Sequence, residues 1–120
     1  MAESNRNPSA PEDEPAVSVR MDGDVVTLTV EGELIEGARR PLVRAVTDLL
    51  LEEPDLRAVR LDLRAVEFMN SAGTGVLVQL QKLCAPRGVD VVLVAPPPAV
   101  VRPLQLTGLW TRFRLDEDAS

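Results

Sequence analysis

Apolar and polar residues alternate near the start of the chain, as they do in a strand with one buried face. The alternation covers residues 17–21 and resumes over 25–31, where β-branched residues are frequent. Asp22 and Gly23 separate the two runs, and glycine supplies the positive φ that a tight turn requires. The pattern therefore predicts a hairpin of two half-buried strands.

Apolar residues then recur every three to four positions in three longer segments, which is the spacing of one helix face. A run that is typical of a strand follows each segment. Pro54 should end the first helix, and Gly88 and Gly108 should close the others. Pro103 lies inside the third segment, so that helix should be kinked or short. We expect helices over residues 38–51, 72–85 and 97–107, and strands over 58–63, 89–94 and 110–115.

The expected order of elements is β-β-α-β-α-β-α-β. Strands that are separated by a helix mostly pair in parallel, whereas the initial hairpin is antiparallel. The predicted fold class is therefore α/β, with a mixed β-sheet of four to five strands and helices packed on it. A chain of 120 residues has the usual size of one domain.

The two ends of the chain differ in composition from the part between them. Residues 1–16 are rich in proline and acidic residues, which cannot bury enough apolar surface to fold. We expect a disordered acidic tail there, a folded domain over 17–115 and an acidic end over 116–120. The opening segment has no signal peptide pattern, and the apolar runs are too short for a membrane helix. These features predict a cytoplasmic protein without direct membrane insertion.

Composition also excludes several classes of function. The net charge of −6 repels phosphate groups, so nucleic-acid binding is not expected. The chain has no histidine, which excludes a Ser-His-Asp triad and a metal site that needs histidine. The single cysteine, Cys84, lies on an apolar helix face and should be a small buried side chain.

The segment Asn-Ser-Ala-Gly-Thr-Gly at 70–75 lies between a strand and a predicted helix. Ser71 is a suitable N-cap, and Gly73 and Gly75 permit close approach to the backbone, although each weakens a helix. Three interpretations are open. The glycines serve tight strand–helix packing; the segment is a phosphate-binding loop, although it lacks the usual spacing; or Ser71 is presented for phosphorylation, since a helix N-terminus tolerates the added charge.

A nucleophilic role for Ser71 has little support. Such a serine needs a base, and Lys82, the only lysine, lies eleven residues along the same helix, about 16 Å away at the helical rise. We therefore expect no catalytic residue, no cofactor and no metal site, and hence no enzymatic activity.

Four short segments together resemble the STAS domain, and within it the anti-sigma factor antagonists of bacterial partner-switching systems. The resemblance spans about residues 17–115. It rests on VEGEL at 30–34, VRLDL at 59–63, FMNSAGTG at 68–75 and LTGL at 106–109.

The resemblance implies a binding switch. Members of this type bind an anti-sigma factor serine kinase when unphosphorylated, which frees a sigma factor. The kinase then phosphorylates one serine at the start of the second helix, and a PP2C-type phosphatase removes the phosphate. Ser71 falls at that position, and a monomer or weak dimer is expected. The implied partner-binding residues are Glu33, Ile35, Asn70, Ser71, Ala72, Gly73, Thr74 and Gly75.

Two positions depart from the family pattern. The family usually has aspartate where this chain has Asn70, and again where it has Ile35. These changes favour a second hypothesis, in which the domain is not phosphorylated and serves as a scaffold in a stress-signalling assembly or as an accessory subunit of a lipid transporter. A nucleotide-binding or hydrolytic protein is a third hypothesis, supported only by the glycines at 73 and 75. Arg39, Arg40 and Arg44 are expected on a solvated helix face.

Overall fold

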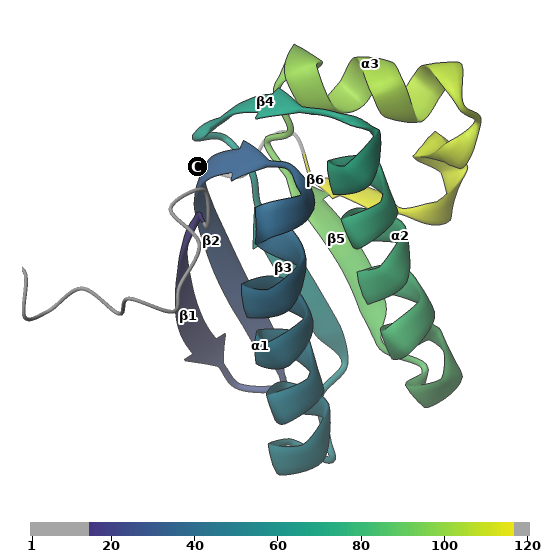
Figure 1. Ribbon diagram of the computed structural model, residues 1–120. Coiled ribbons are helices and arrows are strands. Elements are labelled where there is room, and N and C mark those ends of the chain that lie inside the picture. The colour runs from purple at the N-terminus through teal and green to yellow at the C-terminus, as the bar shows by residue number, and fades with distance from the viewer. Residues whose placement is uncertain (1–14, 117–120) are drawn as a thin grey trace, which may run out of the picture.

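The computed structural model describes residues 15–116, arranged as a sheet with helices on one side (Figure 1). Most of the two expected acidic ends, residues 1–14 and 117–120, lies outside the described residues. The strands are β1 (Ala16–Asp22), β2 (Val25–Leu34), β3 (Ala58–Asp62), β4 (Val66–Met69), β5 (Asp90–Val94) and β6 (Arg114–Asp116). The helices are α1 (Arg39–Glu52), α2 (Ser71–Cys84) and α3 (Pro98–Leu106).

The main path of the sheet runs β1-β2-β3-β5-β6. β1 pairs antiparallel with β2, and the other neighbours pair in parallel. The mixed α/β sheet is therefore confirmed. α1 and α2 lie side by side over one face, whereas α3 lies at one end of the sheet against β4 (Figure 1). The top of the sheet, where β2 and β4 end, is thus close to the start of α1 and of α2.

The sheet has six strands, one more than the upper limit of the sequence prediction. The additional strand is β4, which pairs only with the last residues of β2. The first part of β2, residues 25–29, pairs with β3, and its last part, residues 32–34, pairs with β4, with a register shift between Gly32 and Glu33 inside that second pairing. Val66–Met69 is four residues long, too short for a recognisable alternation, so the sequence pattern did not reveal it.

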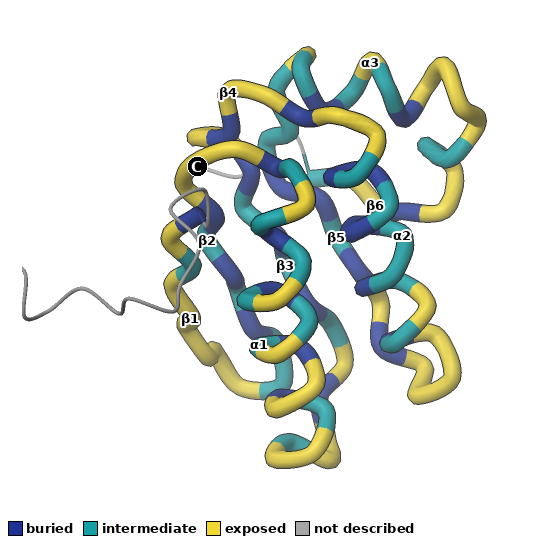
Figure 2. The backbone as a smooth tube through the Cα atoms, viewed as in Figure 1, coloured by how far each residue is buried: buried dark blue, intermediate teal, exposed yellow. Residues whose placement is uncertain are grey.

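The core lies between the sheet and the two long helices, and valine and leucine supply nearly all of it. Buried positions alternate along β2, β3 and β5, as Figure 2 shows. The prediction of a half-buried β1 holds only at Val17, which is partly buried against the core, whereas the side chains of Val19 and Met21 are 52% and 38% exposed. They pair with the buried Leu28 and Val26 and hence share the helix-covered face, but β1 is the edge strand.

Most other elements agree with prediction to within a few residues. Gly23 and Gly88 have the positive φ expected of a hairpin turn and a helix end, with values of 64° and 70°, and Gly108 has a φ of 74°. A 3-10 turn over Glu36–Ala38 precedes α1. Another 3-10 turn, Leu109–Arg112, replaces most of the expected last strand, so only Arg114–Asp116 pairs with β5.

Candidate functional site

The junction between β4 and α2 places Ser71 at the surface. Asn70, not Ser71, is the N-cap: its backbone is extended, and its side-chain Oδ1 accepts a hydrogen bond from the backbone N–H of Gly73 at 3.0 Å. The prediction that Ser71 caps the helix is therefore wrong. Because asparagine caps a helix as well as serine does, Ser71 is left as the first residue of α2 with its side chain exposed.

The two glycines of α2 have different surroundings. A Cβ atom on Gly73 would lie 1.9 Å from the carbonyl oxygen of Leu34, so the first turn of α2 packs directly on the end of β2. The backbone N–H of Asn70 donates to the same oxygen at 3.2 Å. A Cβ atom on Gly75 would meet only Nη2 of Arg39, at an ordinary 3.7 Å. Tight packing therefore explains Gly73, whereas Gly75 lies where a methyl group would fit.

The expected partner-binding residues divide into a surface group and a buried group. Glu33, Asn70 and Ser71 are exposed. Thr74 is buried, and its hydroxyl donates to the carbonyl oxygen of Asn70 at 3.3 Å; Gly73 is buried beneath Leu34. Thr74 and Gly73 therefore lie on the buried side of the first turn of α2 and do not form its outer surface. The half-buried members are Ile35, Ala72 and Gly75.

Phe68 belongs to the same surface, although the sequence did not single it out. It is 48% exposed and stands opposite Glu33 in the β2–β4 pairing. A shallow pocket of about 340 Å³ lies beside it, between β4 and α3, where Pro98 and Arg102 contribute to the lining. The sequence signal that could have indicated it is weak: Phe68 is one of only three aromatic residues in the chain and lies two positions before Asn70.

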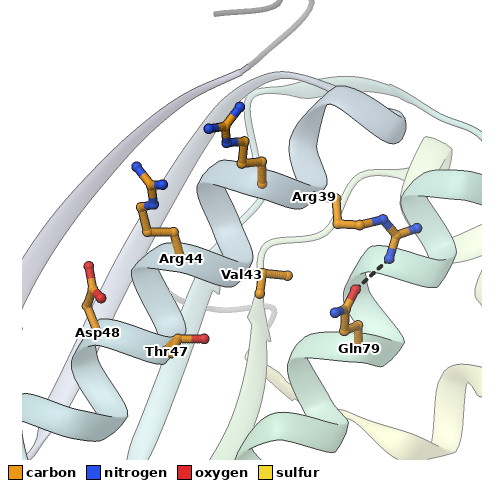
Figure 3. Close-up of a pocket in the computed structure, with 7 residues that line it drawn as sticks. Arg39, Val43, Arg44, Thr47, Asp48 and Gln79 are labelled. Atoms are coloured by element: carbon orange, nitrogen blue, oxygen red, sulfur yellow. Dashed lines mark hydrogen bonds between the residues drawn. The ribbon is translucent and has the colours of Figure 1, made fainter.

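Arg39 connects the start of α1 to α2 and is not simply part of a solvated face. Its Nε and Nη2 donate to the two carboxylate oxygens of Glu36, at 2.9 and 3.1 Å, and its Nη1 donates to Oε1 of Gln79 on α2. Figure 3 shows Arg39 reaching toward Gln79, whereas Arg44 points away from α2. The hydrogen bond from Arg39 lowers the pKa of Glu36, and the same bond raises the pKa of Arg39.

A shallow groove of about 480 Å³ runs along the outer surface of α1 beside these residues. Arg39, Val43 and Gln79 line the part that faces α2, and Arg44 and Asp48 line another part (Figure 3). The spacing of Glu36 and Arg39 predicts such a pair on a helix. The contact with Gln79, forty residues further along the chain, has no local sequence signal.

The single cysteine is part of the core, as predicted. Cys84 is buried on α2, and desolvation raises the pKa of its thiol to about 11. Within residues 15–116, no three His, Cys, Asp or Glu side chains are grouped in a way that could hold a metal ion. No helix of this same part of the chain is long and apolar enough to cross a membrane.

Solved structures of similar shape cover most of the chain. An anti-sigma factor antagonist from Mycobacterium paratuberculosis is 31% identical, with 89% of each chain covered and a TM-score of 0.68. A Thermotoga maritima protein that bears a provisional description as an anti-sigma factor antagonist is 27% identical, with 83% of this chain and 85% of that chain covered and a TM-score of 0.72. The phosphorylated form of SpoIIAA, a Bacillus cell fate determinant, shares the fold at 20% identity, with 86% of this chain and 93% of that chain covered and a TM-score of 0.64.

The pattern of the STAS domain family matches residues 16–119. This match includes every helix and strand described above. Together with the similarity to the Mycobacterium antagonist, it establishes that the chain belongs to the STAS domain family and is similar in sequence and structure to anti-sigma factor antagonists.

Proposed function

We propose that this protein is an anti-sigma factor antagonist that acts in the cytoplasm as a phosphorylation-controlled binding partner of an anti-sigma factor serine kinase. The observation that carries the proposal is the exposed side chain of Ser71 on the first residue of α2. Asn70 fixes the helix start immediately before it. The surrounding surface, which includes Glu33 and Phe68, is where the partner binds.

Phosphorylation would transfer the γ-phosphoryl group of ATP to Oγ of Ser71, with ADP as the leaving group and the hydroxyl proton passing to the kinase. The phosphate adds a charge of about −1.5 to −2 at neutral pH. A helix N-terminus stabilises negative charge, so the domain keeps its fold. The partner loses its contact surface instead, because new bulk and charge project from the middle of it. A PP2C-type phosphatase hydrolyses the phosphoester and restores binding.

The departure at Asn70 is compatible with this switch. The cap requires an acceptor for the N–H of Gly73, and the amide oxygen of Asn70 supplies it at 3.0 Å. Asparagine therefore supplies the cap at this position without the negative charge that an aspartate would carry. The glycines favour no nucleotide site, because the approach to Gly73 is taken by Leu34 of the same chain.

One observation favours the second hypothesis, a domain that binds without being phosphorylated. Ile35, directly after β2, is half-buried and lies where the family usually has an aspartate. With the exposed Phe68, it makes this surface more apolar than an aspartate at position 35 would. A scaffold subunit of a stress-signalling assembly, or an accessory subunit of a lipid transporter, would use such a surface constitutively. In either role the domain binds and does not catalyse.

Binding measurements on Ser71 variants distinguish the two. Affinity for each anti-sigma factor kinase of the source organism is measured by titration calorimetry with the wild type, Ser71→Ala and Ser71→Asp. The switch predicts that Ser71→Ala binds like the wild type and that Ser71→Asp loses binding. Ser18→Asp on the edge strand β1, which is also exposed, is the matched control and should bind normally. Equal binding by Ser71→Asp and Ser71→Ala would reject the switch.

A further inference from the structure

Ser71, Gly75 and Gln79 are four residues apart along α2. Residues at this spacing lie on one face of a helix, with about 5–6 Å between successive Cβ positions. The Arg39 guanidinium lies against the part of this face that Gly75 and Gln79 form. Its Nη1 donates to Gln79, and its Nη2 is 3.7 Å from where a Cβ atom of Gly75 would be. Ser71 is therefore one helical turn from an arginine.

No side chain projects from α2 at Gly75, which lies between Ser71 and Gln79 on this face, and Arg39 Nη2 is the one neighbour that a Cβ there would meet among the described residues. The side chains of helical residues lean toward the N-terminus of the helix, so a larger residue at 75 would stand between them. Gly75 places nothing there. Because the Ser71 side chain also leans toward the helix N-terminus, contact with a phosphate on Ser71 requires the long Arg39 side chain, which is 37% exposed, to swing toward the start of α2.

Arg39 also retains hydrogen-bonding capacity. An arginine side chain has five N–H donors, and the bonds within the described part of the chain use three of them. Its partner Glu36 is weakly held, because its side chain is 67% exposed and water screens such a pair. A phosphate with three acceptor oxygens and nearly twice the charge is a stronger partner for an arginine than an exposed carboxylate is.

We propose that Arg39 is a phosphoserine clasp: when Ser71 is phosphorylated, the guanidinium bonds to the phosphate and ties the start of α1 to the start of α2. The proposal rests on the proposed function in taking Ser71 as the modified residue. Arg39 is a positioning residue in this switch. It holds the phosphate in one orientation and neutralises part of its charge.

The test uses the full chain with phosphoserine incorporated genetically at position 71, so that no kinase is required. The second pKa of the phosphate, ordinarily about 6, is measured by phosphorus NMR. A cation bonded to the phosphate favours its dianion, so we expect the pKa to rise by about half a unit or more in Arg39→Gln. Arg44→Gln, with the same charge change on the same helix but pointing away from α2, should shift it by clearly less.

A second readout does not depend on a substitution. The Nε–H resonance of Arg39 in the wild type should move between the serine and phosphoserine forms and should follow the titration of the phosphate. An unmoved resonance, or equal phosphate pKa values in the wild type and Arg39→Gln, would overturn the clasp. Equal pKa shifts in Arg39→Gln and Arg44→Gln would also overturn it, because they would show that the phosphate responds to the overall positive charge of α1 and not to a bond with Arg39. If no kinase modifies Ser71, the proposed function fails independently of these results.

Discussion

The two glycines of α2 permit a paired test of the packing that positions Ser71. A methyl group at Gly73 would lie 1.9 Å from the carbonyl oxygen of Leu34 and 2.5 Å from its carbonyl carbon. Both are backbone atoms of the last residue of β2, which is fully buried, so neither can move aside as a flexible side chain would. A methyl group at Gly75 meets only the end of the Arg39 side chain at 3.7 Å.

The two substitutions should therefore change stability in opposite directions. Gly73→Ala forces α2 away from β2, and overpacking of a core that cannot relax costs about 3 kcal/mol or more. Gly75→Ala fits and improves helix propensity by about 0.5–1 kcal/mol. For a domain of this size 1 kcal/mol corresponds to about 4–8 °C in Tm, so the two variants should differ by more than about 15 °C.

Urea and thermal unfolding monitored by circular dichroism measure both variants against the wild type. Both variants carry the same Gly→Ala change in the same helix, so the difference in stability between them reports mainly on local packing. A Gly73→Ala protein as stable as the wild type would refute the direct contact between α2 and β2. A strongly destabilised Gly75→Ala protein would refute the open space beside Arg39.

Three further predictions follow from the site and the core. Asn70→Ala should lower the free energy of unfolding by about 1 kcal/mol through loss of the cap, whereas Asn70→Asp should be at least as stable as the wild type, as measured by urea unfolding; equal stability of Asn70→Ala and the wild type would contradict the cap. Cys84 should resist iodoacetamide at pH 8 in the folded protein and react on unfolding, because burial raises its pKa to about 11 and leaves the folded thiol protonated; stability should accordingly fall as the pH rises past the ordinary thiol pKa, where only the unfolded chain ionises. Phe68→Ala should weaken binding of the kinase partner about tenfold or more with little loss of stability, since the ring is half exposed and such aromatic residues often dominate binding; unchanged affinity would remove Phe68 from the interface.

The parts of the fold with strong local signals could be predicted from the sequence. The hairpin and the parallel strands between helices follow from local rules and agree with the structure, although the two turn residues are Gly23 and Asp24, one position later than expected. β4 could not be predicted, because four residues carry no periodicity and its pairing depends on the register shift in β2. The exposure of Val19 likewise depends on how far the helices extend over the sheet edge, which the alternation does not encode.

The candidate site was predicted in position but not in detail. The sequence placed Ser71 at a helix start but assigned it the cap that Asn70 provides, because both residue types suit that position. It offered two explanations for the glycines, and only tertiary contacts distinguish Gly73 from Gly75. The bond between Arg39 and Gln79 joins residues forty positions apart and has no signature in a single sequence.

The central claim is that Ser71 is the regulatory phosphorylation site. Intact-mass spectrometry after incubation with ATP and each anti-sigma factor kinase of the source organism tests it most directly, with the wild type and Ser71→Ala compared. The account predicts a gain of one phosphate on the wild type with one of these kinases and none on Ser71→Ala. Phosphate on Ser71→Ala, or a stable kinase complex in which the wild type never gains phosphate, would contradict it.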